Sequence, residues 1–423
     1  MKACIRPSFI TGSITASPSK SAMQRALALA LLHHGTTVIK NPGISNDDLT
    51  AIEIIKSCGA IVTKKDQQLI IKSNGRISAP STVNFGESGL SLRMFTPIIA
   101  MSDHKIVLNG SGSLLQRPVD FFTEVFPLIN IQTSSNSGRL PVTIQGPLIP
   151  VNIEIDGSLS SQYLTGLLFA FAASVSKPTF IKVNNLKSRP YIYLSMQMLM
   201  HFGHQVTEQP GDIFLISPRT DFQENIDYFT EGDWSGAAFI LVAGAICGNI
   251  EVKGLDIYSA QADRAVLDVL KSCGADLKVM DEQIMVSNAN LLRAFHFDAT
   301  HCPDLFPPLA TLACYCEGTS VIKGVSRLAA KESDRAASLM DIFSKMGVNI
   351  KVDEDEMEIQ GAAILNGASL HSHHDHRIAM AASVAALRAL GDTSIENAEA
   401  VNKSYPMFWK HMESLGGNII IEK

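Results

Sequence analysis

The chain has 423 residues, 18% of them charged and 46% apolar, and a formal net charge of −6 at pH 7. A chain of this length is too long to fold around one hydrophobic core, so we expect two domains. The net negative charge argues against a surface that binds nucleic acids or membranes in general. The sequence contains neither a secretion signal nor the run of about 18 apolar residues that a membrane helix needs. Because its seven cysteines are scattered, we expect reduced thiols and a cytoplasmic protein.

Five expected helix starts in the first half of the chain carry hydroxyl, amide or cationic side chains. They lie at residues 17–25, 85–93, 109–118, 156–163 and 188–191, and four of them include Lys or Arg. A helix start offers unpaired backbone N–H groups and a partial positive charge. We therefore interpret these stretches as anion-binding positions, although each one alone also fits a plain capped helix.

In the second half, Asp304 stands between Pro303 and an apolar helix. Such low-dielectric surroundings are expected to raise the pKa of Asp304 toward neutrality, which suits a general base. An N-cap aspartate is the alternative.

Residues 331–335 read Lys-Glu-Ser-Asp-Arg and precede apolar residues at helical spacing. This spacing predicts that the cluster lies on the first turn of a helix. Lys331 and Arg335, four residues apart, would form an anion trap on one face of that helix. Glu332, a carboxylate among cations, is a candidate proton donor or acceptor. The alternative is a capped surface helix.

Residues 371–377 carry four histidines before another helix. Adjacent histidines in a loop lack a fixed ligand geometry, so we favour an anion site that uses Asp375, His376 and Arg377 over a metal site. Lys403 adds one more cation before the last helix.

The sequence also repeats itself. Residues 52–60 (IEIIKSCGA) reappear as residues 267–275 (LDVLKSCGA), and looser copies end at Gly203, Gly347 and Gly416. A weaker copy at 121–128 lacks the glycine that stops the helix. The marker positions 59, 128, 203, 274, 347 and 416 differ by 69 to 75 residues, and each copy leads into a strand, a turn and usually another strand.

Six α/β units of this kind fit two domains of three units each, with helices packed inside sheets. We expect a first lobe over residues 18–229 and a second lobe over residues 1–17 and 230–423. A first strand is expected over residues 3–10, and the cleft between the lobes is where we expect the chemistry.

Together these residues resemble the 5-enolpyruvylshikimate-3-phosphate (EPSP) synthase family, the enolpyruvyl transferases of the shikimate pathway. The resemblance spans essentially the whole chain and is carried by Ser19-Lys20-Ser21 with Arg25, Ser160-Ser161-Gln162, Pro303-Asp304, Lys331-Glu332-Ser333-Asp334-Arg335 and Asp375-His376-Arg377. It implies an inside-out barrel of two lobes that close on the substrates. It also implies transfer of the enolpyruvyl group of phosphoenolpyruvate to the 5-hydroxyl of shikimate 3-phosphate by addition and elimination. By the same resemblance we expect a monomer that needs no metal or organic cofactor.

The resemblance also implies residue roles. Asp304 would be the base for the 5-hydroxyl, Glu332 would protonate the methylene carbon of phosphoenolpyruvate, and Lys20 would lie near the departing phosphate. The residues implied to contact shikimate 3-phosphate are Lys20, Ser21, Arg25, Ser160, Ser161, Gln162, Ser188, Tyr191, Asp304 and Lys331. Those implied to hold phosphoenolpyruvate are Lys20, Gly89, Arg93, Arg117, Gln162, Arg335, Arg377 and Lys403.

Three alternatives stand beside this interpretation. The sister family of UDP-N-acetylglucosamine enolpyruvyl transferases usually has a cysteine in the loop before Arg117, and residues 110–115 contain none. A non-catalytic phosphometabolite-binding protein would not need Lys20, Asp304 and Glu332 together. A structural repeat protein would not explain the basic residues at so many helix starts. Departures from the family pattern at Leu90, Met94 and Arg327 leave open glyphosate sensitivity and the contact of Arg327 with the shikimate phosphate.

Overall fold

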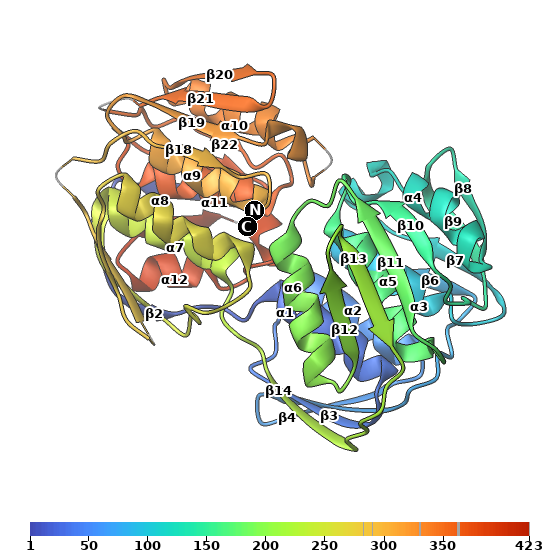
Figure 1. Cartoon of the computed structure of the whole chain (residues 1–423). Coiled ribbons are helices and arrows are strands. Elements are labelled where there is room, and N and C mark those ends of the chain that lie inside the picture. The colour runs from blue at the N-terminus through green and yellow to red at the C-terminus, as the bar shows by residue number, and fades with distance from the viewer. Residues whose placement is uncertain (282, 290, 330, 362–363, 423) are drawn as a thin grey trace. The chain divides into compact units, whose positions relative to one another are not determined.

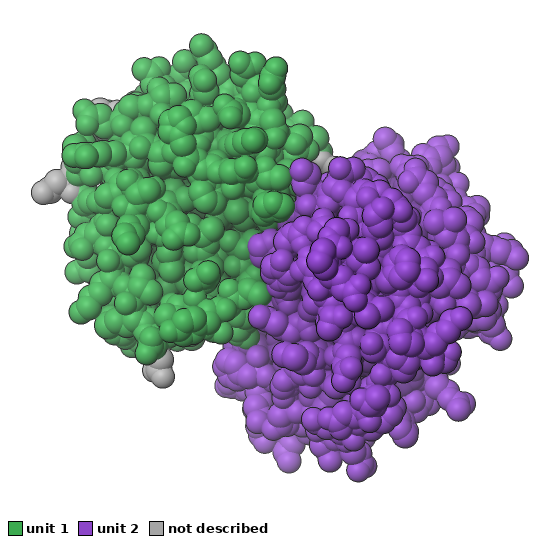
Figure 2. All heavy atoms as spheres, in the orientation of Figure 1, with its two compact units in different colours: residues 1–19, 231–423 green, residues 20–230 purple. Residues whose placement is uncertain are grey.

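The computed structural model describes residues 1–281, 283–289, 291–329, 331–361 and 364–422. The chain divides into two compact units (Figure 2). Unit 1 consists of Met1–Ser19 and Glu231–Lys423, and unit 2 consists of Lys20–Thr230. In the described parts of the chain, no helix combines the length and the apolar composition that crossing a bilayer requires.

All six sheets that the described residues form share one plan of four strands. A first strand pairs in parallel with a second, the second pairs antiparallel with a third, and the third pairs antiparallel with a fourth. A buried helix precedes the second strand in the chain, and a further helix follows it. The predicted fold class, repeated α/β units with helices inside sheets, is confirmed.

Unit 2 contains three of these sheets (Figure 1). In sheet order they are β14 (Asn225–Phe229), β3 (His34–Lys40), β5 (Gln68–Asn74) and β4 (Ile61–Lys65); β6 (Thr82–Asn84), β7 (Lys105–Asn109), β9 (Arg139–Gln145) and β8 (Gln132–Asn136); and β10 (Ile153–Asp156), β11 (Thr179–Asn184), β13 (Ile213–Ser217) and β12 (Gln205–Gln209). The inner helices are α1 (Lys20–Leu32), α3 (Gly89–Ile99) and α5 (Ser161–Ser174), and most of their residues are buried. The other helices are α2 (Asn46–Ser57), α4 (Asp120–Val125) and α6 (Arg189–His201), with the 3₁₀ turns η1 (Gly112–Gln116) and η2 (Phe126–Ile129).

Unit 1 contains the other three sheets. They are β2 (Ile10–Thr15), β15 (Gly248–Lys253), β17 (Gln283–Ser287) and β16 (Asp276–Val279); β18 (His296–Asp298), β19 (Thr319–Lys323), β21 (Glu356–Gln360) and β20 (Asn349–Asp353); and β22 (Ser369–His371), β23 (Thr393–Glu396), β1 (Lys2–Arg6) and β24 (Asn418–Glu422). The inner helices are α7 (Trp234–Cys247), α9 (Phe306–Ala313) and α11 (His376–Ala386). The remaining elements are α8 (Val266–Ser272), α10 (Arg335–Lys345) and α12 (Phe408–Ser414), with the 3₁₀ turns η3 (Ala262–Ala265), η4 (Pro303–Leu305), η5 (Val325–Arg327) and η6 (Ala398–Lys403).

The three inner helices of unit 1 are buried along their whole length. Helix α7 is apolar all round, which is typical of a helix enclosed on every side. Close packing requires a small residue at Gly244, where a Cβ would lie 2.5 Å from Cγ1 of Ile250 in β15. The core of unit 1 therefore lies among its helices, with the sheets outside.

The glycines that end the repeated helices behave as predicted. Gly59, Gly203, Gly274, Gly347 and Gly416 all have φ between +78° and +108°, a conformation that glycine adopts without steric cost. In the sixth copy, which lacks the glycine, the left-handed residue is Asn130, with φ at +66°.

The predicted strand over residues 3–10 is confirmed over residues 3–6 but is wrong beyond them, because β1 ends at Arg6 and a second strand begins at Ile10. Strands β1 and β2 flank Pro7, which has no N–H to donate to a sheet. Strand β1 joins β23 and β24, and β2 pairs in parallel with β15. The first and last strands of unit 1 thus lie side by side, as the neighbouring N and C labels in Figure 1 show.

Candidate active site

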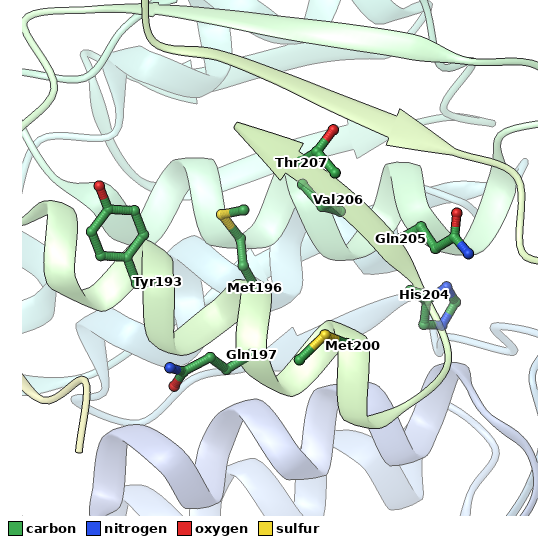
Figure 3. A pocket seen from close by; sticks show the side chains of 8 residues that line it. All are labelled: Tyr193, Met196, Gln197, Met200, His204, Gln205, Val206 and Thr207. Atoms are coloured by element: carbon green, nitrogen blue, oxygen red, sulfur yellow. The ribbon is translucent and has the colours of Figure 1, made fainter. Parts of the chain in front are cut away.

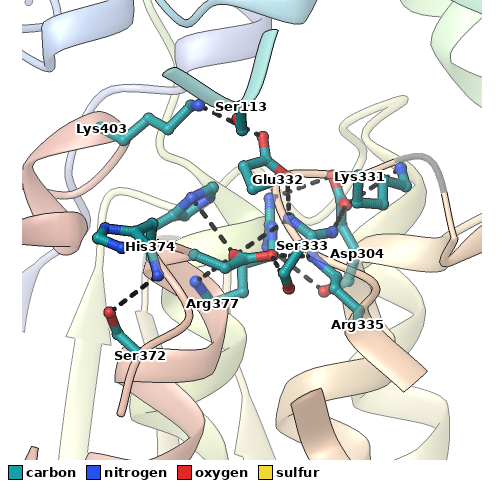
Figure 4. A network of polar contacts seen from close by, with 12 residues as sticks. Ser113, Asp304, Lys331, Glu332, Ser333, Arg335, Ser372, His374, Arg377 and Lys403 are labelled. Carbon is teal, nitrogen blue, oxygen red and sulfur yellow. Dashed lines mark hydrogen bonds and ion pairs between the residues drawn. The ribbon is translucent and has the colours of Figure 1, made fainter. Parts of the chain in front are cut away.

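Arg335 is the centre of a polar cluster in unit 1, here called the unit 1 cluster and drawn in Figure 4. Its members are Asp304, Lys331, Glu332, Arg335, Asp375, Arg377 and Lys403. The Arg335 side chain is 1% exposed. Its Nε donates to Oδ2 of Asp375 at 2.8 Å, its Nη1 to Oδ1 of Asp304 at 2.7 Å and its Nη2 to Oε2 of Glu332 at 2.6 Å. Because charge-assisted hydrogen bonds are short and directional, one guanidinium orients three carboxylates.

Helix α10 begins at Arg335, four residues later than the sequence predicted. Asp334 is the N-cap, and its side chain accepts a hydrogen bond from the backbone N–H of Ala337 at 3.1 Å. Lys331 and Glu332 therefore precede the helix, and the prediction that they lie on its first turn is wrong. The physical reason is that the Asp334 side chain caps the helix by accepting the N–H of Ala337, so the helical turns begin after it.

Asp304 lies in the 3₁₀ turn η4, immediately before helix α9. Besides Arg335, its carboxylate contacts Nη2 of Arg377 at 3.1 Å and Nζ of Lys331 at 3.5 Å. Burial by itself would raise the pKa of Asp304, but the charges of Arg377, Lys331 and Arg335 together hold that pKa well below its usual value of 3.8. The expected rise toward neutrality is therefore wrong.

The pKa of Lys331 is lowered as well, but for a lysine this shift favours the neutral form. Burial lowers its pKa to about 8, although the negative charge of Asp304 acts in the other direction. This lysine can therefore gain or lose its charge near neutral pH, which is unusual for an ammonium group.

Glu332 is held between two cations. It accepts the hydrogen bond from Arg335, and its Oε1 lies 4.0 Å from Nζ of Lys403. The side chain is 10% exposed, so water reaches it poorly. The hydrogen bond from Arg335 therefore fixes the position of the Glu332 carboxyl group.

Asp375 connects the cluster to helix α11. It is fully buried and is the N-cap of α11, where its Oδ1 accepts from the backbone N–H of Arg377 at 2.9 Å. Its Oδ2 also accepts from Oγ of Ser333 at 3.2 Å. Asp375 therefore fixes Arg335 and Arg377 relative to each other.

The neighbouring histidines make contacts of other kinds. Nε2 of His373 lies 2.9 Å from Oδ2 of Asp341, and the backbone N–H of His373 donates to Nδ1 of His371 at 2.8 Å. Across the part of the chain that the structure describes, no three His, Cys, Asp or Glu side chains are grouped so that they could hold a metal ion.

In unit 2, four of the predicted site residues lie together at the start of helix α3. A Cβ on Gly89 would collide with Nη1 of Arg117 and would lie 3.6 Å from Nη1 of Arg93. Arg93 in turn donates to Oε1 of Gln162 at 3.0 Å, and its guanidinium lies 5.4 Å from the ring centre of Tyr163. Two cations and an amide thus surround a backbone that carries no side chain.

A second group in unit 2 is built around Arg25 in helix α1. The Arg25 guanidinium is buried and donates to the carbonyl of Ser21 at 2.8 Å, to Oγ of Ser195 at 2.9 Å and to the carbonyl of Tyr191 at 3.4 Å. Burial lowers the pKa of Arg25 to about 10, so it remains charged at neutral pH. Lys20, the first residue of α1, forms an ion pair with Oδ2 of Asp47 at 2.9 Å.

The predicted serines lie at helix starts. Ser160 is the N-cap of α5 and accepts from the backbone N–H of Gln162 at 3.3 Å, and Ser161 is the first residue of that helix. Ser188 precedes α6 with φ at +53°, which L residues adopt only with strain. Tyr191 follows on the first turn of α6.

Two residues that contact these groups carry no role in the sequence-based interpretation. Asp47 binds Lys20, and Ser195 binds Arg25. Arg189, the cation of the expected anion-binding position at residues 188–191, forms ion pairs with Glu208 and Asp212. A signal for Asp47 exists in the sequence, because Ser45 and Asp48 have the spacing of a capping box that marks a helix start.

A pocket of about 440 Å³ lies on helix α6 and strand β12 (Figure 3). It is lined by Tyr193, Met196, Gln197, Met200, His204, Gln205, Val206 and Thr207. None of these is a lysine or arginine, and burial lowers the pKa of His204 to about 4, so it is neutral at pH 7. The pocket therefore offers no cation to a phosphate or carboxylate.

Comparisons with known proteins indicate one family along nearly the whole chain. The family model for EPSP synthase (3-phosphoshikimate 1-carboxyvinyltransferase) matches residues 6–412. A curated relative of that name from Clostridium kluyveri is 36% identical over 416 residues, covering 98% of this chain and 97% of the relative. Another, from Clostridium novyi, is 34% identical over 425 residues, with coverage of 98% and 97%.

Solved structures extend the agreement to the fold. An EPSP synthase from Acinetobacter baumannii, 25% identical, matches with a TM-score of 0.83 over 100% of both chains. The enolpyruvyl transferase NikO from Streptomyces tendae, 18% identical, has a TM-score of 0.81 over 99% of this chain and 98% of its own, and shares the fold. From the family match and the identity to these relatives, the chain belongs to the EPSP synthase family.

Proposed function

We propose which steps of this family's reaction the site residues of unit 1 and those of unit 2 carry out. The chain is an enolpyruvyl transferase of the shikimate pathway, which leads to the aromatic amino acids. It joins the 5-oxygen of shikimate 3-phosphate to C2 of phosphoenolpyruvate while C3 gains a proton. Elimination then removes a proton from C3 and breaks the bond between C2 and the phosphate oxygen. In our assignment the unit 1 cluster moves the protons, and both units supply cations to the anionic substrates.

Asp304 is assigned to accept the proton of the 5-hydroxyl. Its low pKa means that, without substrate, Asp304 is ionised but only weakly basic, because Arg377, Lys331 and Arg335 face it. Both arginines are assigned to phosphoenolpyruvate, whose negative charge offsets theirs on binding. The basicity of Asp304 therefore rises when the substrate arrives, which couples proton removal to occupancy of the site.

Glu332, in its protonated form, is assigned to protonate C3 in the addition, and the carboxylate so formed takes a proton back in the elimination. The proton that Asp304 accepts from the 5-hydroxyl is released to solvent when the products leave. The hydrogen bond from Arg335 fixes the carboxyl group of Glu332, and Lys403 lies beside its other oxygen. Lys20 in unit 2 is assigned to stabilise the negative charge of the departing phosphate. The contact of one guanidinium with both Asp304 and Glu332 is the observation that carries this assignment, because it orients the base and the acid from a single group.

The binding roles follow the same logic. The two substrates bring two phosphates and two carboxylates, so their mutual repulsion must be offset by cations. We assign Lys20, Ser21, Arg25, Ser160, Ser161, Gln162, Ser188, Tyr191, Asp304 and Lys331 to shikimate 3-phosphate. We assign Lys20, Gly89, Arg93, Arg117, Gln162, Arg335, Arg377 and Lys403 to phosphoenolpyruvate. The grouping of Gly89, Arg93, Arg117 and Gln162 supports the second assignment.

Phosphate release from phosphoenolpyruvate tests the proposal, with shikimate 3-phosphate and UDP-N-acetylglucosamine offered as alternative acceptors. We expect turnover only with shikimate 3-phosphate, and a fall in kcat of about 10²-fold or more in Glu332→Gln, because the acid is lost. Glu251→Gln is the matched control, since Glu251 also pairs with a lysine of unit 1, Lys253, at 3.4 Å. Turnover with the nucleotide sugar would assign the acceptor of the sister family, and a wild-type kcat in Glu332→Gln would contradict the role of Glu332.

A further inference from the structure

The ion pair between Lys20 and Asp47 differs from the exposed pairs of the same unit. Its side chains are 16% and 6% exposed, whereas Lys56 and Glu53, another pair on α2, are 43% and 70% exposed at a similar distance of 2.7 Å. Solvent screens an exposed pair, so its restraint on the lysine is weak. A buried pair is screened much less, and removing one partner leaves an uncompensated charge. Asp47 therefore restrains the Lys20 ammonium strongly.

Asp47 is itself held in place by the start of helix α2. The backbone N–H of Asp48 donates to Oγ of Ser45 at 3.2 Å, and the Ser45 hydroxyl and backbone N–H donate to Oδ2 of Asp48 at 2.6 and 3.1 Å. This capping box fixes the first turn, on which Asp47 lies. A carboxylate at a helix N-terminus is also favoured by the helix dipole. The acceptor that faces Lys20 is thus charged and rigid.

We propose that Asp47 is a positioning residue that holds the Lys20 ammonium group in one place for the transfer reaction. A lysine has a flexible four-carbon stem, so an unrestrained ammonium spends time in many positions. Charge that is oriented before the reaction stabilises developing negative charge more effectively than charge that must be ordered during it. The inference rests on the role proposed above for Lys20 at the departing phosphate, and it adds the residue through which that role is maintained.

Steady-state kinetics of four variants test the proposal. Asp47→Ala is expected to lower kcat by about 10²-fold, as a misplaced catalytic group can, and to raise each KM by a smaller factor, because Lys20 is also assigned to bind both substrates. Asp47→Asn keeps an acceptor oxygen and is expected to lose less. Because Asp47 acts through Lys20, the double variant Lys20→Ala/Asp47→Ala should have the same kcat as Lys20→Ala alone. Glu53→Ala, which breaks the exposed pair on the same helix, should keep the wild-type kcat.

The outcomes separate this inference from the proposed function. A wild-type kcat in Asp47→Ala, or a loss that persists at full size on the Lys20→Ala background, overturns the inference alone. A wild-type kcat in Lys20→Ala removes the role of Lys20 and the inference with it. If thermal melting shows that Asp47→Ala does not fold, the isosteric Asp47→Asn is placed in the same double-variant comparison and decides the question.

Discussion

At the scale of single residues, the surroundings of Asp304 show which properties a local sequence can reveal. Pro303 and the apolar helix α9 are visible in the sequence, and they led to the expected rise in pKa. The cations that reverse the shift, Lys331, Arg335 and Arg377, come from later in the chain and meet Asp304 only in the fold. The resemblance to the family identified the residue, but its ionisation depends on contacts that no local pattern contains.

Lys331 leads to a prediction about pH. Its pKa of about 8 means that it loses its positive charge as the pH rises through that value. Since Lys331 is assigned to bind shikimate 3-phosphate, kcat/KM for this substrate should fall above pH 8 in the wild type. Lys331→Arg keeps its charge to a pH of about 12 or higher and should lack that fall. Parallel profiles for the two proteins between pH 6 and 9.5 would show that another group controls the pH dependence.

At the scale of elements, local rules predicted much of the repeat. The helix-stop glycines and the hairpin of β4 and β5 were found where the pattern indicated, because the residues that form a turn are neighbours in the sequence. The predicted start of α10 was wrong because Asp334, inside the polar stretch, supplies the cap, so the helix begins after it. The membership of β1 in the sheet of β23 and β24 could not be predicted locally, because its partners lie at the other end of the chain.

The capping box of α2 gives a prediction about stability. Burial raises the pKa of Asp48 to about 7 from its usual 3.8. Between these values the folded protein keeps a proton that the unfolded chain releases, so stability falls as the pH rises from about 4 to 7. Asp48→Asn should lack this fall and exceed the wild type at pH 8 by on the order of a few kcal/mol.

Urea unfolding at pH 5, 6, 7 and 8 measures this difference. Glu53→Gln, on the exposed side of the same helix, is the control and should follow the wild type. A difference between Asp48→Asn and the wild type that stays constant over this pH range would contradict the assigned pKa of Asp48.

At the scale of the whole molecule, a net acidic chain concentrates cations at a few places. The net charge is −6, yet Arg335, Arg377, Lys331 and Lys403 gather in one cluster, and Arg93 and Arg117 meet at Gly89. The repeat and the family were readable from the sequence because both depend on motifs along the whole chain. Asp47, which orients Lys20, was assigned no catalytic or binding role, because its contact with Lys20 is set by packing between helices α1 and α2.

Hydrogen exchange at C3 of phosphoenolpyruvate tests the central claim most directly. The proposed addition turns the methylene carbon into a methyl group with a proton from Glu332, and reversal or elimination then removes one of three hydrogens. In D₂O with shikimate 3-phosphate, the wild type should place deuterium on the methylene carbon of recovered substrate and product, read by mass spectrometry. Glu332→Gln should lose this exchange by about 10²-fold or more while still binding shikimate 3-phosphate in calorimetry. Exchange at the wild-type rate in Glu332→Gln would contradict the assignment of Glu332 as the proton donor.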